Sequence, residues 1–252
     1  MLTAVSLGPG HESLLTPAAR VALENAEVIV GYKGYMDLVP PELLQGKEIF
    51  STGMMGEVER VNHAVDCAEQ GRRTAVVCSG DAGIYAMAGL MLEALEARGL
   101  LDSVPFEVVP GVPAFNAAAA LLGAPLMHDF CSISLSDLLT PWELIRKRVR
   151  LAAEGDFVIC LYNPRSKRRS DHLAEALDLI AEHRDPQTPV GIVNRAWREG
   201  QKVHTCALEH VDSGLVDMQT MVLVGNSATR RVGGFLLTPR GYHTKYEVGS
   251  SL

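Results

Sequence analysis

Short apolar runs alternate with longer amphipathic segments along the first half of the chain. The apolar runs lie at residues 2–7, 27–30, 74–78 and 106–109, and segments with helical spacing lie at 16–26, 57–70, 87–98 and 114–122. An alternation of strands and helices is typical of a mostly parallel sheet with helices on its faces. The pattern therefore predicts an α/β fold for this half.

Local signals mark where several of these helices begin and end. Thr16 places a hydroxyl before Pro17, which suits the first position of a helix. Gly71 and Gly99 follow two helical segments and predict their ends.

The second half repeats this logic after an interruption. The periodic pattern dissolves between residues 123 and 141, and Thr140 to Glu143 resembles a capping box that starts a new helix. Strands are expected near 157–161, 189–193, 201–205 and 220–224, and helices near 142–154 and 171–183. We predict an α/β domain at 1–122, a linker region at 123–141 and a second α/β domain at 142–252.

Composition narrows the classes of partner and compartment. The 252 residues carry a net charge of -7, which argues against a nucleic-acid partner. The five cysteines form no CxxC pair, and we identify no histidine at zinc-ligand spacing from them, so we expect reduced thiols and no metal site. No charged leader precedes the first strand and no run of 18 apolar residues occurs, so we expect a cytoplasmic protein that does not enter a membrane.

Two glycine loops carry the candidate chemistry. Ser79 to Tyr85 follows the apolar run at 74–78, and Gly8-Pro9-Gly10 follows the first run. Open α/β sheets bind ligands at such strand ends, and glycines let a ligand approach the main chain. Either loop alone fits an ordinary strand-to-helix turn, but two together indicate a nucleoside-like cofactor, with Asp81 as hydrogen-bond acceptor or helix cap.

The first loop does not match the dinucleotide fingerprint. Ser13 stands at the position of its third glycine, a proline, Pro9, lies between the first two glycines, and the first long helix starts only near Thr16. A pyrophosphate needs the helix N-terminus directly at the turn, so a nicotinamide or flavin site is not expected.

A cluster of cations follows the strand at 157–161. Arg165, Lys167, Arg168 and Arg169 occupy four of five positions, and Arg195 and Arg198 lie after the strand at 189–193. Such a run is often a solvated loop, but its place at a strand end favours carboxylate binding. His128-Asp129 offers a proton acceptor or a hydrogen-bonded structural pair.

Five segments, in this order, resemble the tetrapyrrole methylase family of S-adenosylmethionine-dependent enzymes. They are Gly8 to Gly10, Ser79 to Tyr85, Pro110 to Ala114, Leu161 to Ser166 and Leu237 to Tyr242. GYKGY at 31–35 and the segment 121–142 resemble one branch closely, which methylates C(17) of a cobalamin precursor and contracts its ring. The family's more usual GDP is GDA at Gly80 to Ala82, and Asn163 replaces a methionine.

The resemblance implies two α/β domains of the class III methyltransferase type, with the active site in the cleft between them, working as a homodimer. It assigns S-adenosylmethionine contacts to Pro9, Ser79, Gly80, Asp81, Ile84, Pro113, Ala114, Asn163 and Ala196. We assign the anionic tetrapyrrole to Gly8, Gly10, Arg165, Lys167, Arg168 and Arg195. His128, Asp129 and Asp81 are ranked in that order as the proton acceptor for ring contraction.

Several alternatives stay open at this point. The resemblance points first to a metal-free macrocycle, and the runner-up, which the sequence alone does not separate from it, is a macrocycle already loaded with cobalt. The product is a candidate for direct transfer to neighbouring pathway enzymes. A non-catalytic tetrapyrrole carrier and an RNA methylase of the same superfamily are the other readings. The loops assigned to S-adenosylmethionine are intact, which argues against a non-catalytic carrier. The negative net charge argues against an RNA substrate.

Overall fold

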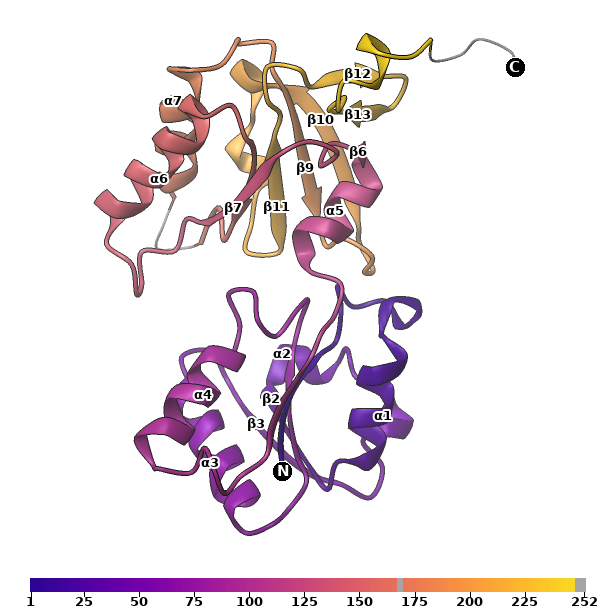
Figure 1. Ribbon diagram of the computed structural model, residues 1–252, viewed down its shortest axis with the longest axis vertical. Coiled ribbons are helices and arrows are strands. Elements are labelled where there is room, and N and C mark those ends of the chain that lie inside the picture. The colour runs from indigo at the N-terminus through magenta and orange to yellow at the C-terminus, as the bar shows by residue number, and fades with distance from the viewer. Residues whose placement is uncertain (167–169, 248–252) are drawn as a thin grey trace. The chain divides into compact units, whose positions relative to one another are not determined.

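The chain forms two compact α/β units, Met1–Ala114 and Phe115–Leu252. The structure is a computed structural model and describes residues 1–166 and 170–247. Figure 1 shows both sheets with their helices. The α/β class predicted from the sequence is confirmed, and each unit has its own sheet and its own apolar core.

The first unit is built on a five-stranded sheet in which every neighbouring pair is parallel, in the order β3-β2-β4-β1-β5. Its strands are β1 (Leu2–Ser6), β2 (Val28–Tyr32), β3 (Glu48–Thr52), β4 (Thr74–Cys78) and β5 (Phe106–Val109). The connecting helices are α1 (Pro17–Asn25), α2 (Lys33–Met36), α3 (Glu57–Glu69) and α4 (Ala88–Ala97), with short 3₁₀ turns at Glu12–Leu14 and Pro41–Leu43.

Alternating side chains of these strands face two different apolar clusters. One face packs on α3 and α4, where Val61, Met91 and Leu95 are buried. The other packs on α1 and the segment after β2, where Leu23 and Val39 are buried. Both faces of this parallel sheet are therefore covered, as such sheets require.

The predicted helix boundaries are mostly confirmed in this unit. The Thr16 hydroxyl accepts the amide N–H of Ala19 at 3.1 Å and caps α1. Gly71 and Gly99 follow the C-caps of α3 and α4 with φ of 84° and 66°, the left-handed conformation that glycine favours. The sequence pattern missed β3.

The second unit departs from the predicted repetition of the first. Its sheet has the order β10-β9-β11-β8-β7, and only the β7–β8 pair is parallel. The strands are β7 (Phe130–Ser134), β8 (Val158–Tyr162), β9 (Pro189–Asn194), β10 (Lys202–Ala207) and β11 (Thr220–Val224), with α5 (Ala114–Leu122), α6 (Trp142–Glu154) and α7 (His172–Ala181). The segment between β9 and β10 is too short for a crossover, so these strands pair as a hairpin.

The segment expected as a linker at 123–141 instead supplies strands to the second unit. β7 lies beside β8, and β6 (Gly123–Ala124) joins β12 (Arg230–Val232) and β13 (Phe235–Leu237) in a small three-stranded sheet. The expected capping box is wrong, because the N-cap of α6 is Pro141 and no side chain caps it. The remaining 3₁₀ turns are Leu208–His210, Ser213–Leu215 and Tyr242–Thr244.

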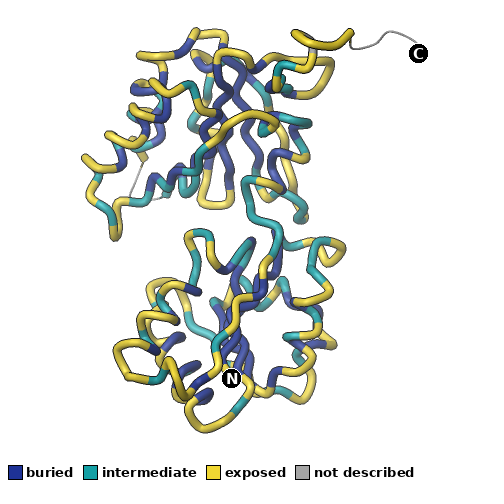
Figure 2. Tube along the Cα trace, viewed as in Figure 1, coloured by how far each residue is buried: buried dark blue, intermediate teal, exposed yellow. Residues whose placement is uncertain are grey.

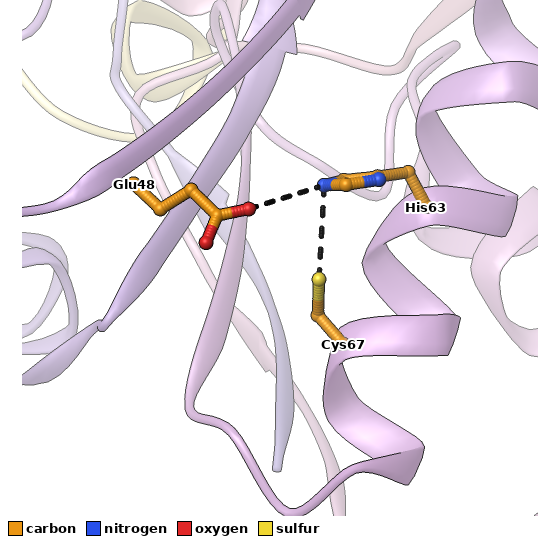
Figure 3. Close-up of side chains that lie close together, drawn as sticks. All are labelled: Glu48, His63 and Cys67. Carbon is orange, nitrogen blue, oxygen red and sulfur yellow. Dashed lines mark hydrogen bonds and ion pairs between the residues drawn. The ribbon is translucent and has the colours of Figure 1, made fainter.

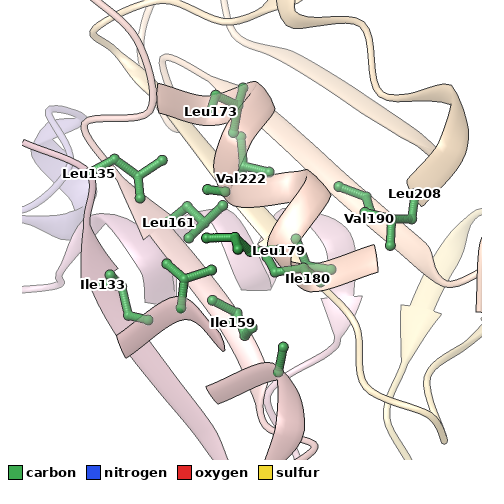
Figure 4. Packing of buried hydrophobic residues seen from close by; sticks show 14 of the residues in the cluster. Ile133, Leu135, Ile159, Leu161, Leu173, Leu179, Ile180, Val190, Leu208 and Val222 are labelled. Atoms are coloured by element: carbon green, nitrogen blue, oxygen red, sulfur yellow. The ribbon is translucent and has the colours of Figure 1, made fainter. Parts of the chain in front are cut away.

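The core of the second unit lies between its sheet and the helices α6 and α7 (Figure 4). Ile159, Leu161 and Val222 project from the strands toward Leu173 and Ile180 of α7. Figure 2 shows the central strands of both units as buried and the helices as mixtures of buried and exposed residues. Among the described residues, no helix combines the length and the apolar character needed to cross a membrane.

Candidate functional site

Three loops of the first unit meet at one edge of its sheet. They follow β1, β4 and β5, which are neighbours in the order β4-β1-β5. Because the strands are parallel, their carboxyl ends lie at the same edge. Gly8 and Gly80 join two of the loops through reciprocal backbone hydrogen bonds of 3.0 and 2.7 Å. The two glycine loops recognised in the sequence therefore form one structure.

The third loop approaches the first two with no room for a side chain. A Cβ on Gly111 would lie 2.5 Å from Ser6 Cβ and 2.7 Å from the carbonyl oxygen of Gly80. The buried Ser6 hydroxyl accepts the amide N–H of Ala82 at 2.8 Å and fixes the second loop from below. No role was predicted for Ser6 or Gly111, although Gly111 lies in the segment Pro110 to Ala114 that resembles the family.

Gly80 is constrained by its conformation more than by its surroundings. Its φ is 72°, and a Cβ would lie 3.6 Å from the Ala114 amide nitrogen and 3.8 Å from Pro113 Cα, which is ordinary contact. The structure thus brings Gly80, Pro113 and Ala114 together, as the predicted donor site requires. Pro9, Gly10, Ser79 and Ile84 lie on the same three loops.

Asp81 ties the second loop to the third. One carboxylate oxygen accepts the amide N–H of Gly83 at 2.8 Å, and the other accepts the amide N–H of Gly111 at 3.0 Å. Both oxygens are therefore occupied by backbone donors. This geometry suits a residue that positions the loops better than the proton acceptor ranked from the sequence.

In the second unit, the predicted positions follow β8 and β9. Asn163 has φ of 50° and donates its side-chain amide to the Ser134 hydroxyl at 3.0 Å, which links the ends of β8 and β7. Ala196 lies between Arg195 and Trp197, whose φ values of 48° and 58° are unusual for non-glycine residues. This turn is strained, as loops at functional sites often are.

The predicted cations differ in how they are held. One guanidinium nitrogen of Arg165 donates to the Ser213 carbonyl at 2.6 Å, which orients the side chain along the loop. Arg195 is exposed, and its backbone N–H donates to the Gln219 carbonyl at 2.9 Å. Lys167, Arg168 and Arg169 lie outside the described residues.

His128 and Asp129 form a local pair in the second unit. The amide N–H of Asp129 donates to His128 Nδ1 at 2.8 Å, and the Asp129 carboxylate lies 3.5 Å from the same nitrogen. A neutral ring that accepts at Nδ1 carries its proton on Nε2. The pair is largely exposed, with 44% of the His128 side chain accessible.

A second cluster of chemically active side chains was not expected. Glu48 of β3 meets His63 and Cys67 of α3 (Figure 3). His63 and Cys67 are four positions apart and lie on one face of the helix. That spacing is visible in the sequence, so the prediction that no histidine stands at ligand spacing from a cysteine is wrong.

The cysteines of the described chain are free thiols, as predicted, and all but Cys131 are buried. Burial raises the pKa of Cys78 and of Cys131 to about 11 each. Burial also raises the pKa of Cys160 and Cys206. Such thiols stay protonated near neutral pH and are poor nucleophiles.

Comparison with known proteins places this geometry in a family. Residues 1–212 match the family model of the tetrapyrrole (corrin/porphyrin) methylases. The chain belongs to this family. A relative from Salmonella typhimurium, named "Probable cobalt-factor III C(17)-methyltransferase", is 50% identical over 96% of this chain and 99% of its own length. A precorrin-3B C(17)-methyltransferase from Sinorhizobium is 38% identical over 96% of each chain.

Solved structures support the same placement. The crystal structure of the methyltransferase CobJ superposes with a TM-score of 0.90 at 42% identity, covering 94% of this chain and 99% of the other. A cobalt precorrin-4 methyltransferase superposes with a TM-score of 0.72 at 24% identity and shows the shared fold.

Proposed function

We propose that this protein is the S-adenosylmethionine-dependent methyltransferase that methylates C(17) of a cobalamin precursor and contracts its macrocycle. The observation that carries the proposal is the convergence of three backbone-tight loops at one sheet edge, in a chain 50% identical to a C(17)-methyltransferase over nearly its whole length. A loop junction that excludes Cβ atoms suits a ligand held by main-chain groups.

The donor contacts are proposed at the three loops of the first unit. Gly80, Asp81, Pro113 and Ala114 lie together there, and Asp81 holds the loop spacing through its two amide contacts. Methyl transfer from a sulfonium needs the nucleophilic carbon, the methyl group and the sulfur in line, and the leaving group is already activated. The chief demand on these loops is therefore rigid positioning.

The metal state of the macrocycle separates two candidate substrates. The resemblance pointed first to precorrin-3B, with its cobalt-loaded counterpart, cobalt-factor III, as the alternative. Relatives named for cobalt-factor III are 50% and 42% identical to this chain over nearly full length, against 38% for the one named for precorrin-3B. These identities favour cobalt-factor III, with cobalt as part of the substrate.

Ring contraction needs a proton acceptor, because a ring hydroxyl loses its proton as a carbon bond migrates. Asp81 has both oxygens engaged by amides, and His128 Nδ1 accepts the amide of Asp129. The Asp129 carboxylate, 82% accessible, is the least committed of the three candidates. We therefore place Asp129 first as the acceptor and keep His128 as its partner.

The test is a direct transfer assay. The purified full chain is incubated with methyl-labelled S-adenosylmethionine and either precorrin-3B or cobalt-factor III, and the products are analysed by mass spectrometry. We expect one label per macrocycle and faster conversion of the cobalt-loaded substrate. If neither substrate yields labelled macrocycle, the proposed function is wrong. If only precorrin-3B is labelled, precorrin-3B and not cobalt-factor III is the substrate.

A homodimer is proposed for the working protein. Met54, Met55 and Val58 leave more than 60% of their surfaces exposed between β3 and the start of α3, which is unusual for large apolar side chains. Met91 of α4, by contrast, is fully buried in the first core and is not available for an interface. A monomer mass by light scattering at micromolar concentration would contradict this assignment.

A further inference from the structure

Three side chains of metal-ligating types converge beside the edge strand of the first sheet. His63 Nε2 lies 3.8 Å from a Glu48 carboxylate oxygen and 3.7 Å from Cys67 Sγ. One ligating atom from each residue lies within 4.8 Å of both others (Figure 3). The strand β3 presents the carboxylate, and α3 presents the imidazole and the thiol from one face.

We propose that Glu48, His63 and Cys67 form a binding site for a divalent metal ion of the zinc class. Imidazole nitrogen, thiolate sulfur and carboxylate oxygen are the three ligand types that zinc takes in proteins. Tetrahedral coordination at the usual bond lengths places ligand atoms about 3.4–3.6 Å apart. The distances from His63 Nε2 to the Glu48 oxygen and to Cys67 Sγ exceed this by a few tenths of an ångström. A water molecule would fill the fourth coordination position of the ion.

The neighbours of the cluster orient two of the ligands. Phe50 stacks on the His63 ring with centroids 3.9 Å apart and planes 18° apart, which fixes the ring plane. Arg72 donates to one Glu48 oxygen at 2.7 Å, while the other oxygen faces His63. A ligating carboxylate is commonly held in this way by a hydrogen bond to its second oxygen.

Arg72 lies beside two of the three proposed ligands. Arg72 balances Glu48, and its guanidinium also lies 3.9 Å from Cys67 Sγ. The metal would bind Cys67 as the thiolate, which a neighbouring guanidinium also stabilises.

This site is separate from methyl transfer. Neither β3 nor α3 contributes to the three loops that follow β1, β4 and β5. The ion would join the edge strand β3 to α3. Edge strands have one unpaired side, so a metal clamp there would stabilise the first unit without entering the reaction.

The test uses Co²⁺ as a spectroscopic probe and Zn²⁺ as the competitor. Titration of the full chain with Co²⁺ should give a thiolate-to-metal charge-transfer band that saturates near one equivalent and disappears when Zn²⁺ is added. Cys67→Ser should abolish the band, and His63→Gln and Glu48→Gln should each weaken Zn²⁺ binding at least tenfold. Cys131→Ser, a partly exposed thiol in the second unit, is the matched control and should leave the band unchanged.

Each other result decides against the site. A charge-transfer band that persists in Cys67→Ser, or Zn²⁺ binding unchanged in His63→Gln, would place the metal elsewhere. No band in the wild-type chain would remove the proposal. Far-UV circular dichroism checks that each variant folds. If Cys67→Ser is unfolded, Zn²⁺ binding by His63→Gln, a change at a partly exposed residue, takes its place as the test. None of these readouts depends on methyl transfer, so failure here leaves the proposed function standing.

Discussion

The candidate positions in the two units are held by different means. In the first unit, backbone contacts between glycine loops build the site, with Ser6 and Asp81 binding amide groups. In the second unit, the positions depend on side-chain contacts such as Asn163 to Ser134 and on turns with positive φ. Loops that pack through their main chains leave no room for an added side chain. Positions held by side-chain hydrogen bonds can lose one such bond without a change of backbone. The two should therefore respond differently to substitution.

Gly111→Val should have the largest effect, because it fills the junction of the three loops. Its Cβ would lie 2.5 Å from Ser6 Cβ, so the backbone must move. We expect the affinity for S-adenosylmethionine, measured by calorimetry, to fall by about a hundredfold or more, and the free energy of unfolding to fall by about 1–3 kcal/mol.

Gly89→Ala is the matched control for this loop variant. Gly89 lies in α4, and nothing lies within 4 Å of the Cβ that alanine would add. We expect unchanged donor affinity and a gain of roughly 0.5–1 kcal/mol in stability. Wild-type donor binding by Gly111→Val would show that the donor does not use this junction.

Alkaline pH should weaken the first unit through Cys78, which ends β4 directly before the second loop. Burial raises the pKa of Cys78 to about 11, above the value of about 8.5 for an unfolded thiol. The unfolded state then loses a proton that the folded state keeps. Stability is full below about pH 8.5 and falls by up to about 1.4 kcal/mol per pH unit as the pH rises toward 11.

Urea unfolding at pH 8 and pH 10 measures this dependence. Cys78→Ala should lower the free energy of unfolding at both pH values. It should also reduce the difference in this free energy between pH 8 and pH 10 by about 2 kcal/mol. Cys160→Ala provides the comparison in the second unit, where burial also raises the thiol pKa. An unchanged difference in Cys78→Ala would show that another group causes the alkaline loss.

Asp81→Asn should have a smaller effect and separates positioning from catalysis. Asparagine keeps one acceptor oxygen but turns an NH₂ group toward the other backbone amide, so one of the two loop contacts is lost. We expect the Kd for the donor to rise about tenfold, which corresponds to about 1–2 kcal/mol. The pH profile of kcat should stay unchanged. A fall in kcat at unchanged donor affinity would restore Asp81 as the proton acceptor.

The contrast between the units also explains what the sequence could predict. The strands β1, β4 and β5 are short apolar runs between glycine or proline signals, and their positions and loops follow from local pattern. The strand β3 was missed because it is an edge strand with polar or exposed residues such as Glu48 and Thr52. The strand β7 was missed for the same reason, and residues 123–141 then resembled a linker.

The pairing of strands within a sheet was harder to predict from the sequence than the positions of the strands themselves. The strand β9 has the same apolar pattern in a parallel or an antiparallel sheet, and only the length of the segment before β10 indicates a hairpin. The contacts of Asp81 with Gly111 depend on chain folding over thirty positions and carry no local signal. The spacing of His63 and Cys67 was visible, but Glu48 joins them only through the tertiary fold.

The smallest effect is expected from the cations of the second unit, which we propose bind the macrocycle's carboxylates. Arg165 is held by the Ser213 carbonyl and Arg195 is exposed, so each should contribute about 1 kcal/mol or less. Arg165→Ala combined with Arg195→Ala should raise KM for the macrocycle about tenfold or less, weaken its dependence on salt and leave donor affinity unchanged. Arg73→Ala, at an exposed arginine of the first unit, controls for the loss of a positive charge outside the proposed site and should change neither constant. Lower donor affinity with an unchanged KM would instead assign these arginines to the cofactor and remove the distinction between the two units.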